Sequence, residues 1–245
     1  MTLIINADDF GFSESINRGI IESYKQGLIS STTLMMNMPG TKNAIELYKE
    51  NEGLGLGVHL NLTKGKPLTG GTKTLTKEKG EFHYIQDEQK LTFLDQEEAY
   101  KELKAQIESF IAFGIKPSHL DNHHYIHKFK NIREVIHRLA LEYRLPIRIS
   151  DEAHREEARA LGIKTTDYII DSFYGEIATA EELLRSISNL RQDATVEIVS
   201  HPGFMDEDTM KETSYNIGRE KEILELKRFK ENNLNVELIN YRSII

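Results

Sequence analysis

Short runs of apolar and β-branched residues alternate along the chain with longer amphipathic stretches. Each short run predicts a strand, and each longer stretch with apolar residues three and four positions apart predicts a helix. A first strand is expected over residues 2–7. A helix should follow from an N-cap at Ser13 to about Gln26, where Gly27 ends it. The other predicted strands are 31–37, 54–62, 117–122, 146–150, 166–170, 195–200 and 236–239.

Amphipathic stretches predict a helix in most of the gaps between these strands. Asp95 is expected to cap a helix that runs to about Phe113, and Thr179 with Glu182 forms a capping box for a later one. The other predicted helices are 41–51, 131–143, 152–161 and 214–232. Seven or eight strand–helix units predict one α/β domain over residues 1–245, a (β/α) barrel of seven to eight parallel strands that need not all be regular. A doubly wound open sheet is the alternative.

The segment 63–94 interrupts this rhythm. It contains Gly65, Pro67, Gly70, Gly71 and Gly80 and shows neither a helical nor a strand period. A connection of this length inside a compact domain is usually a functional loop or a small hairpin excursion. We expect it to line a substrate cleft, to reach a partner, or both.

Composition narrows the range of functions. The chain carries a formal net charge of −8, which disfavours a nucleic-acid partner or an anionic membrane surface. No apolar run is long enough for a membrane span, and no signal peptide is evident. Because the chain has no cysteine, any metal must be held by histidines and carboxylates, and a cytoplasmic enzyme is expected.

Polar residues gather at the ends of the predicted strands. In α/β barrels the carboxyl ends of the strands form the mouth of the active site, and the catalytic residues come from several strands. The gathering of polar residues at the strand ends therefore predicts a catalytic rim there. Its members are Asp8 and Asp9 after the first strand, His59 and Asn61 on the third, His119, Asp121 and His123 on the fourth, Arg148 on the fifth, and His201 after the seventh.

Each of these residues also has a structural interpretation. Asp8 and Asp9 before a glycine could form an Asx turn, although a divalent cation would relieve their mutual repulsion. His59 alone is typical of a satisfied core histidine. Arg148 could pair with a helix-borne glutamate or orient Asp8. His201 could be a loop residue, and opposite a metal it becomes a candidate general acid.

The segment HLDNHHYIH, residues 119–127, is the densest cluster of candidate ligands. His119, Asp121 and His123 share one face of a strand, whereas His123 and His127 share a face if the chain turns helical after Asn122. At least one metal ligand is expected here, and His123, His124 and His127 all stay open as candidates. Three other histidines, His83, His137 and His154, are expected to be surface or structural residues.

Four segments in this order and spacing resemble the YdjC-like carbohydrate deacetylase family, which includes chito-oligosaccharide deacetylases. They are NADDFG (6–11), GVHLNLT (57–63), HLDNHHYIH (119–127) and SHPG (200–203). The resemblance covers most of the chain and implies a deacetylase-type barrel, a homodimer and one divalent metal ion. The ion is expected to be Mg²⁺, with Zn²⁺ as the alternative.

The resemblance also implies roles for individual residues. Asp9, His59 and His123 look like the metal ligands, Asp8 like the general base, His201 like the general acid, and Arg148 like a residue that supports the base. Asn61, Tyr125, His127 and Phe204 are the expected substrate contacts. The chain departs from the family pattern at Asn122 and Tyr125, and it has no tryptophan to stack on a sugar. That stacking would fall to aromatic residues such as Tyr84 or Tyr174.

These expectations predict a metal-dependent hydrolase that removes acetyl groups from N-acetylated carbohydrates, with short chito-oligosaccharides as substrates. An ester-cleaving deacetylase cannot be separated from this prediction by sequence. Two rival functions are a phosphoesterase or amidohydrolase on a similar barrel, and a non-catalytic protein that senses a sugar. The expected partner is an acetylated oligosaccharide.

Overall fold

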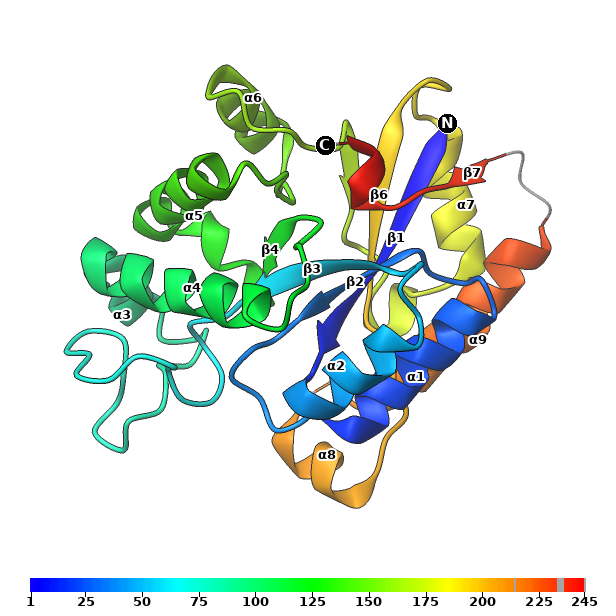
Figure 1. Cartoon of the computed structure of the whole chain (residues 1–245). Helices are drawn as coiled ribbons and strands as arrows, with labels where there is room; N and C mark the ends of the chain where they lie inside the picture. The colour runs from blue at the N-terminus through cyan, green and yellow to red at the C-terminus, as the bar shows by residue number, and fades with distance from the viewer. Residues whose placement is uncertain (214, 233–235, 245) are drawn as a thin grey trace.

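In the computed structural model, which describes residues 1–213, 215–232 and 236–244, seven parallel strands form one curved sheet surrounded by helices (Figure 1). The hydrogen-bonded order is β4-β3-β2-β1-β6-β5, and β7 pairs with β1. The strands are β1 Thr2–Phe10, β2 Ser31–Leu34, β3 Gly55–Leu60, β4 Leu120–Asn122, β5 Tyr168–Ile170, β6 Thr195–Ser200 and β7 Glu237–Leu238. The predicted α/β class and the parallel strands are confirmed.

The sheet is an open half-barrel because β4 and β5 do not join. The strand predicted at 146–150 is wrong: within the described residues it contributes one isolated bridge, between Ile147 and Leu120. The backbone N–H of Ile147 instead donates to the carbonyl of Lys164, in the loop before β5, at 3.0 Å. No second ladder forms among the described residues there, so the gap between the two edges stays open.

The three helix caps predicted from the sequence are confirmed. The side chain of Ser13 accepts a hydrogen bond from the backbone of Ile16, Asp95 accepts from two backbone N–H groups, and Thr179 accepts from Glu182. The helices are α1 Glu14–Lys25, α2 Thr41–Lys49, α3 Glu88–Thr92, α4 Gln96–Ile111, α5 Lys130–Tyr143, α6 Glu152–Ala160, α7 Ala180–Ser188, α8 Glu207–Glu212 and α9 Ile217–Glu231. The sequence did not predict α3 and α8, and residue 214, the predicted start of the last helix, lies outside the described residues.

The excursion 63–94 forms the loops beside β3 and α4 at one side of the half-barrel (Figure 1). It contains α3 and one antiparallel bridge between Thr76 and Phe82. Two glutamates of α4 hold it: Glu102 accepts from the backbone of Thr69 at 2.8 Å, and Glu98 accepts from the backbone of Thr74 at 2.8 Å. Two carboxylates of one helix therefore define where this long loop lies.

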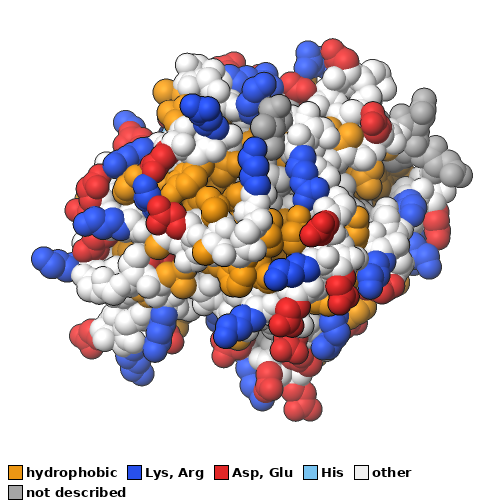
Figure 2. All heavy atoms as spheres, in the orientation of Figure 1, with side chains coloured by type: hydrophobic (Ala, Val, Ile, Leu, Met, Phe, Trp, Pro, Cys, Tyr) orange, Lys and Arg blue, Asp and Glu red, His pale blue; other side chains and the backbone are white. Residues whose placement is uncertain are grey.

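Charged side chains of both signs are interspersed over the face of the molecule shown in Figure 2. Hydrophobic side chains are visible between them near the middle of this face. Among the described residues, no helix combines the length and the apolar character that crossing a bilayer requires.

Candidate active site and metal centre

The end of β1 sends two consecutive carboxylates in different directions. The pairing of β1 with β2 shifts register between Ala7 and Phe10, and Asp9 has a left-handed backbone with φ of 70°. A non-glycine residue adopts this conformation at an energetic cost, and such irregularities re-aim side chains next to functional sites. Asp8 consequently faces Arg148, whereas Asp9 faces His59 and His123.

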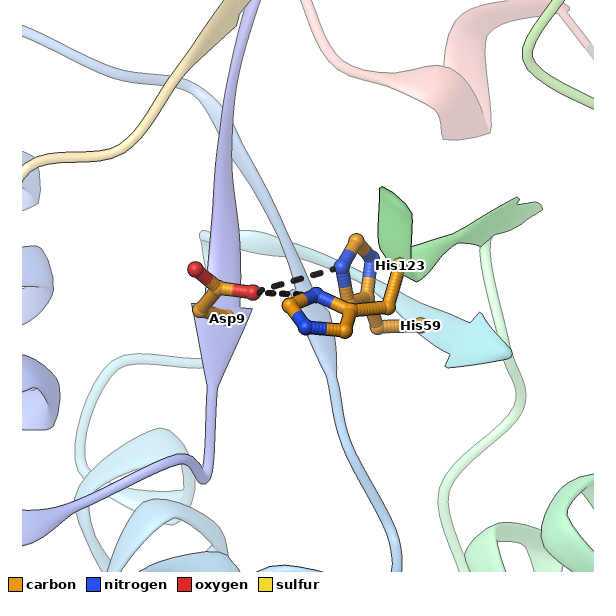
Figure 3. A group of neighbouring side chains, drawn as sticks. All are labelled: Asp9, His59 and His123. Carbon is orange, nitrogen blue, oxygen red and sulfur yellow. Dashed lines mark ion pairs between the residues drawn. The ribbon is translucent and has the colours of Figure 1, made fainter. Parts of the chain in front are cut away.

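Asp9, His59 and His123 converge from β1, β3 and the start of the turn η1, His123–Lys128 (Figure 3). The Asp9 Oδ1 atom lies 3.4 Å from His59 Nε2 and 3.0 Å from His123 Nδ1. This Oδ1 is buried and accepts no hydrogen bond of acceptable geometry from the described residues. A buried oxygen without a partner, facing two imidazole nitrogens, fits the donor set of a divalent cation. These three residues could hold a metal ion.

Neighbouring charges orient two of these side chains. Arg219 of α9 donates to Asp9 Oδ2 at 2.6 Å, which leaves Oδ1 free toward the histidines. Asp121 accepts from His59 Nδ1 at 2.7 Å and so leaves Nε2 directed at Asp9. Burial opposes ionisation of Asp9, but Arg219 and His123 outweigh it and hold its pKa well below the usual value. Burial likewise lowers the pKa of His59, but Asp121 outweighs it and raises that pKa to about 10. Cation binding would release the extra proton of His59.

A second group of possible ligands, Asp8, His59 and Asp121, already contains a cation. Arg148 donates to both oxygens of Asp8 at 2.7 Å and lies 2.9 Å from Asp121 Oδ2. Its side chain is 1% exposed. Because the guanidinium occupies the space between these carboxylates, Asp9, His59 and His123 are the candidate metal centre, called the metal centre below.

His201 faces Asp8 across the rim, with Nε2 3.8 Å from Asp8 Oδ2. On its other side, Nδ1 lies 3.8 Å from Glu222 Oε1, too far for a hydrogen bond but close enough for a strong charge interaction. Tyr215 donates to the same Glu222 oxygen at 2.6 Å, and the backbone N–H of His201 donates to Oε2. Burial lowers the pKa of His201, but Glu222 outweighs it, so the pKa is raised above the usual value. A histidine whose pKa is raised in this way is suited to donate a proton at the rim.

Within the segment 119–127, the structure brings only His123 into this metal centre. His124 stacks on His123, with ring centroids 3.7 Å apart, and its Nδ1 lies 2.9 Å from the Thr63 hydroxyl. Both His124 and Tyr125 have positive φ, which breaks the helical spacing of His123 and His127. His119 is buried against Tyr241, and burial lowers its pKa to about 3.

His127 points instead toward two helix-borne histidines. Its Nδ1 lies 2.6 Å from the side chain of Asn122, and its ring centroid is 5.1 Å from that of His154. The Nε2 atoms of His137 and His154 are 3.0 Å apart. We call His127, His137 and His154 the helix-side histidines. All three are buried, so the expectation that His137 and His154 are structural fits their positions.

A cavity of about 560 Å³ opens above the metal centre. Asp8, His201 and Tyr125 line it together with the metal-centre residues, and Arg148 lies buried beneath Asp8. Its aromatic lining comes from Phe12, Tyr84, Tyr125, Tyr174 and Tyr215.

The other three expected substrate contacts lie outside this lining. Asn61 is buried and shapes the start of the excursion, since its side chain accepts from the backbone of Thr63 at 3.0 Å. His127 belongs to the helix-side histidines. Phe204 is 36% exposed and follows Gly203, which packs against Gly19 of α1.

Sequence reasoning missed Arg219, Glu222 and Glu197. The first two lie three positions apart on one helix, which places them on one face, but nothing distinguishes them from the other charged residues of that helix. Glu197 carried a usable signal. It stands in the middle of the apolar strand TVEIVS, and a carboxylate inside a buried strand requires a cationic partner.

A family model described as YdjC-like protein matches residues 2–233. The chain belongs to the YdjC-like family. A curated relative from Clostridium beijerinckii, named carbohydrate deacetylase, is 41% identical over 251 residues, and the match covers 100% of both chains. The family predicted from the four segments is therefore confirmed, and the predicted enzyme class, a carbohydrate deacetylase, agrees with the name of this relative.

Solved structures show the same architecture. A protein of Enterococcus faecalis named for cellobiose-phosphate cleavage matches with a TM-score of 0.91 and 33% identity, over 99% of this chain and 98% of that one. A peptidoglycan N-acetylglucosamine deacetylase matches with a TM-score of 0.55 and 11% identity, over 100% of this chain and 87% of that one. The second likeness concerns the fold alone.

Proposed function

We propose that this member of the YdjC-like family is a metal-dependent hydrolase that removes acetyl groups from N-acetylated carbohydrates, with short chito-oligosaccharides as substrates. The observation that carries the proposal is the free Oδ1 of Asp9 facing His59 and His123, with Asp8 and His201 on the rim of the same cavity. Metal-assisted hydrolysis needs these three parts, a cation site, a base and an acid, within reach of one substrate.

The charge balance of the interior also supports a cation. More carboxylates than guanidiniums are buried around the site. Apart from Glu222, which faces His201, the carboxylates are Asp8, Asp9, Asp121 and Glu197, and the guanidiniums are Arg148 and Arg219. With His59 neutral, this group lacks two positive charges, which a divalent ion supplies. Uncompensated buried charge is expensive, so the arrangement favours a bound ion over an empty site.

The two aspartates then have separate tasks. Asp9 is a ligand together with His59 and His123, and a bound divalent ion supplies Lewis acidity toward the acetyl carbonyl and water. Asp8, oriented by the two hydrogen bonds from Arg148, takes a proton from the attacking water. His201, whose protonated form Glu222 favours, gives a proton to the departing amine nitrogen.

The donor set bears on the identity of the ion. Two imidazoles and one carboxylate are typical ligands of Zn²⁺ and related transition metals, whereas Mg²⁺ prefers oxygen ligands. The family resemblance favours Mg²⁺, so we keep Mg²⁺ and Zn²⁺ as the two candidates and leave the decision to reconstitution.

The shape of the surface supports a substrate longer than one sugar. A second cavity of about 750 Å³ adjoins the first, and Phe12, Lys64 and Tyr84 line both. Tyr84 is 57% exposed and offers a ring face to a pyranose. A disaccharide or trisaccharide with one acetamido group at the metal centre would extend along this groove.

The test is chelation followed by reconstitution. Purified protein is stripped with a chelator, dialysed, and supplied with Mg²⁺, Zn²⁺ or Co²⁺, and acetate release from N,N′-diacetylchitobiose is measured. We expect no release from the stripped protein and recovery with at least one of these ions. Release that is unaffected by complete metal removal would contradict the metal-dependent mechanism.

The substrate class is tested with the same reconstituted protein. A panel adds N,N′,N″-triacetylchitotriose, an O-acetylated oligosaccharide and p-nitrophenyl phosphate. Acetate release from the ester alone would reassign the enzyme as an esterase, and phosphate release alone would favour a phosphoesterase. Homodimer assembly and a cytoplasmic location stay predictions from the sequence.

A further inference from the structure

Tyr241 lies inside the half-barrel although it belongs to the turn η3, Tyr241–Ile244, near the end of the described chain. Its side chain is 0% exposed. The ring stacks on His119, with centroids 3.7 Å apart and planes 7° from parallel. Its hydroxyl donates to Glu197 Oε2. A buried tyrosine with both a stacking partner and a carboxylate acceptor is fixed in place from two directions.

The backbone around β7 delivers Tyr241 to this position. β7 pairs with Thr2 and Leu3 at the N-terminal end of β1, whereas β2 pairs with β1 only from Asn6 onward. Glycines on β3 then leave space beside the turn η3. A Cβ at Gly55 would lie 2.7 Å from Asn240, and a Cβ at Gly57 would lie 2.5 Å from the His119 ring. The glycine-rich start of β3 therefore admits the turn and the ring on which Tyr241 stacks.

Glu197 connects Tyr241 to Arg148, which binds Asp8 on the catalytic rim. Its Oε1 accepts from Arg148 Nε at 2.8 Å, while the two terminal nitrogens of Arg148 bind Asp8 at 2.7 Å. Glu197 stands opposite Ile4 in the pairing of β6 with β1, and Asp8 follows at the far end of β1. Arg148 thus spans the interior. Glu197 accepts from Nε and lies 2.8 Å from Nη2, while Asp8 and Asp121 hold the terminal nitrogens.

We propose that Tyr241 is a positioning residue for the base: it fixes Glu197, Glu197 fixes Arg148, and Arg148 fixes Asp8. The inference rests on the deacetylase proposed above, in which Asp8 is the base. Without the Tyr241 hydroxyl, Glu197 Oε2 loses its hydrogen-bond donor in a buried site that water does not reach. Arg148 then loses a fixed anchor, and the two hydrogen bonds that hold Asp8 lose their alignment.

Tyr241→Phe tests this inference, because it keeps the ring on His119 and removes only the hydroxyl. We expect kcat to fall about tenfold, the lower end of the range for outer residues that orient a metal site. KM and bound metal should stay unchanged, since no group that touches substrate or ion is altered. The matched control is Tyr48→Phe, which removes the hydrogen bond from Arg242 to Tyr48 at 2.7 Å, a contact of the same turn that does not involve Glu197. Its kcat should equal that of the unmodified protein.

A double-mutant cycle tests the route. In a Glu197→Gln background, adding Tyr241→Phe should change kcat by less than about twofold, because the two residues act through one contact. An unchanged kcat in Tyr241→Phe, or the same fall in both backgrounds, would overturn the inference.

A readout without turnover separates this inference from the proposed function. Hydrogen exchange of the Arg148 Nε–H, followed by ¹⁵N NMR, should accelerate in Tyr241→Phe and not in Tyr48→Phe. If the unmodified protein releases no acetate, the proposed function fails while this exchange measurement still tests the connection from Tyr241 to Arg148. If the unmodified protein releases acetate but the exchange rate of the Arg148 Nε–H is the same in Tyr241→Phe, the positioning role alone is wrong.

Discussion

Two groups of buried histidines each include one residue of the turn η1, and they differ in what faces them. His59 and His123 stand at strand ends with Asp9 between them and Asp121 behind. The helix-side histidines His127, His137 and His154 face one another and Asn122, and the carboxylate of Glu157 lies 3.8 Å from His137 on the side away from His154. Burial lowers the pKa of His127 to about 3 and that of His154 to about 4.

From this comparison we infer that carboxylates, more than the number of imidazoles, mark the proposed metal centre. A carboxylate fixes the tautomer of a ligating histidine and balances the charge of the ion. Among the helix-side histidines, the backbone of Ser150 donates to His154 Nδ1 at 3.2 Å, which leaves Nε2 of His154 to donate to His137. His137 and His154, neutral rings joined in this way, satisfy each other and have no need of a cation.

The largest expected effect separates the two groups by substitution. His59→Gln removes a ligand whose second nitrogen binds Asp121, and should lower kcat/KM about 10³-fold together with loss of bound metal. His154→Gln should keep both within about twofold, since it touches neither Asp9 nor the cavity. Metal analysis and acetate release on the two purified variants check this. An equal loss of metal in both would show that the helix-side histidines bind the ion as well.

A second effect, of comparable size, separates the two aspartates. Asp8→Asn should lower kcat about 10²–10⁴-fold, the usual contribution of a general base, and leave bound metal unchanged. The reason is that Asp8 faces Arg148 and His201, whereas Asp9 faces the two ligating histidines. The bound metal of the purified variant is measured by inductively coupled plasma mass spectrometry. Loss of the metal would mean that the roles assigned to the two aspartates are wrong.

The pH dependence extends the comparison to His201, whose pKa a neighbouring carboxylate raises. Burial lowers the pKa of His201, and Glu222 raises it further than burial lowers it. Because the acid acts in its protonated form, activity should fall as pH rises through this pKa. Glu222→Gln removes the raising charge, so the basic limb of the kcat/KM profile should move to lower pH. If the basic limb does not move in Glu222→Gln, a group other than His201 produces it.

The smallest expected effect concerns stability. His154→Gln should lower the free energy of unfolding by about 1 kcal/mol, because it disrupts one buried hydrogen-bonded contact. The pKa of His154 is depressed by burial from 6.5 to about 4 in the folded protein. The unfolded chain therefore binds this proton more readily, so the contribution of His154 to stability declines as pH falls from 6.5 toward 4. Urea melts at about pH 7.5 and about pH 5 should show less acid sensitivity in the variant than in the unmodified protein.

Strand and helix positions could be predicted from the sequence wherever a local signal was strong. Ser13, Asp95 and Thr179 mark helix starts by their own side chains, so these boundaries needed no tertiary information. The segment 146–150 has the composition of a strand, but whether it pairs depends on a neighbour that the sequence does not specify. The open edge between β4 and β5 was unpredictable for that reason.

The residues of the site also divide into those with a local sequence signal and those placed only by tertiary contacts. Asp9, His59 and His123 could be placed on one rim with other strand-end residues because parallel strands share that rim, and the family resemblance then singled them out as ligands. Arg219 and Glu222 come from a helix that passes that rim from outside, and no local pattern records the contact. The spacing of His123 and His127 suggested a shared face, and two left-handed residues, His124 and Tyr125, removed it. Only the folded backbone shows this break.

The most direct test of the metal centre is anomalous diffraction from a crystal of the metal-free protein soaked with Zn²⁺ or Co²⁺. We expect a peak bounded by Asp9 Oδ1, His59 Nε2 and His123 Nδ1, and none between His137 and His154. An empty map at Asp9, or a peak between the two helix-side histidines instead, would contradict the assignment of the metal to the strand ends.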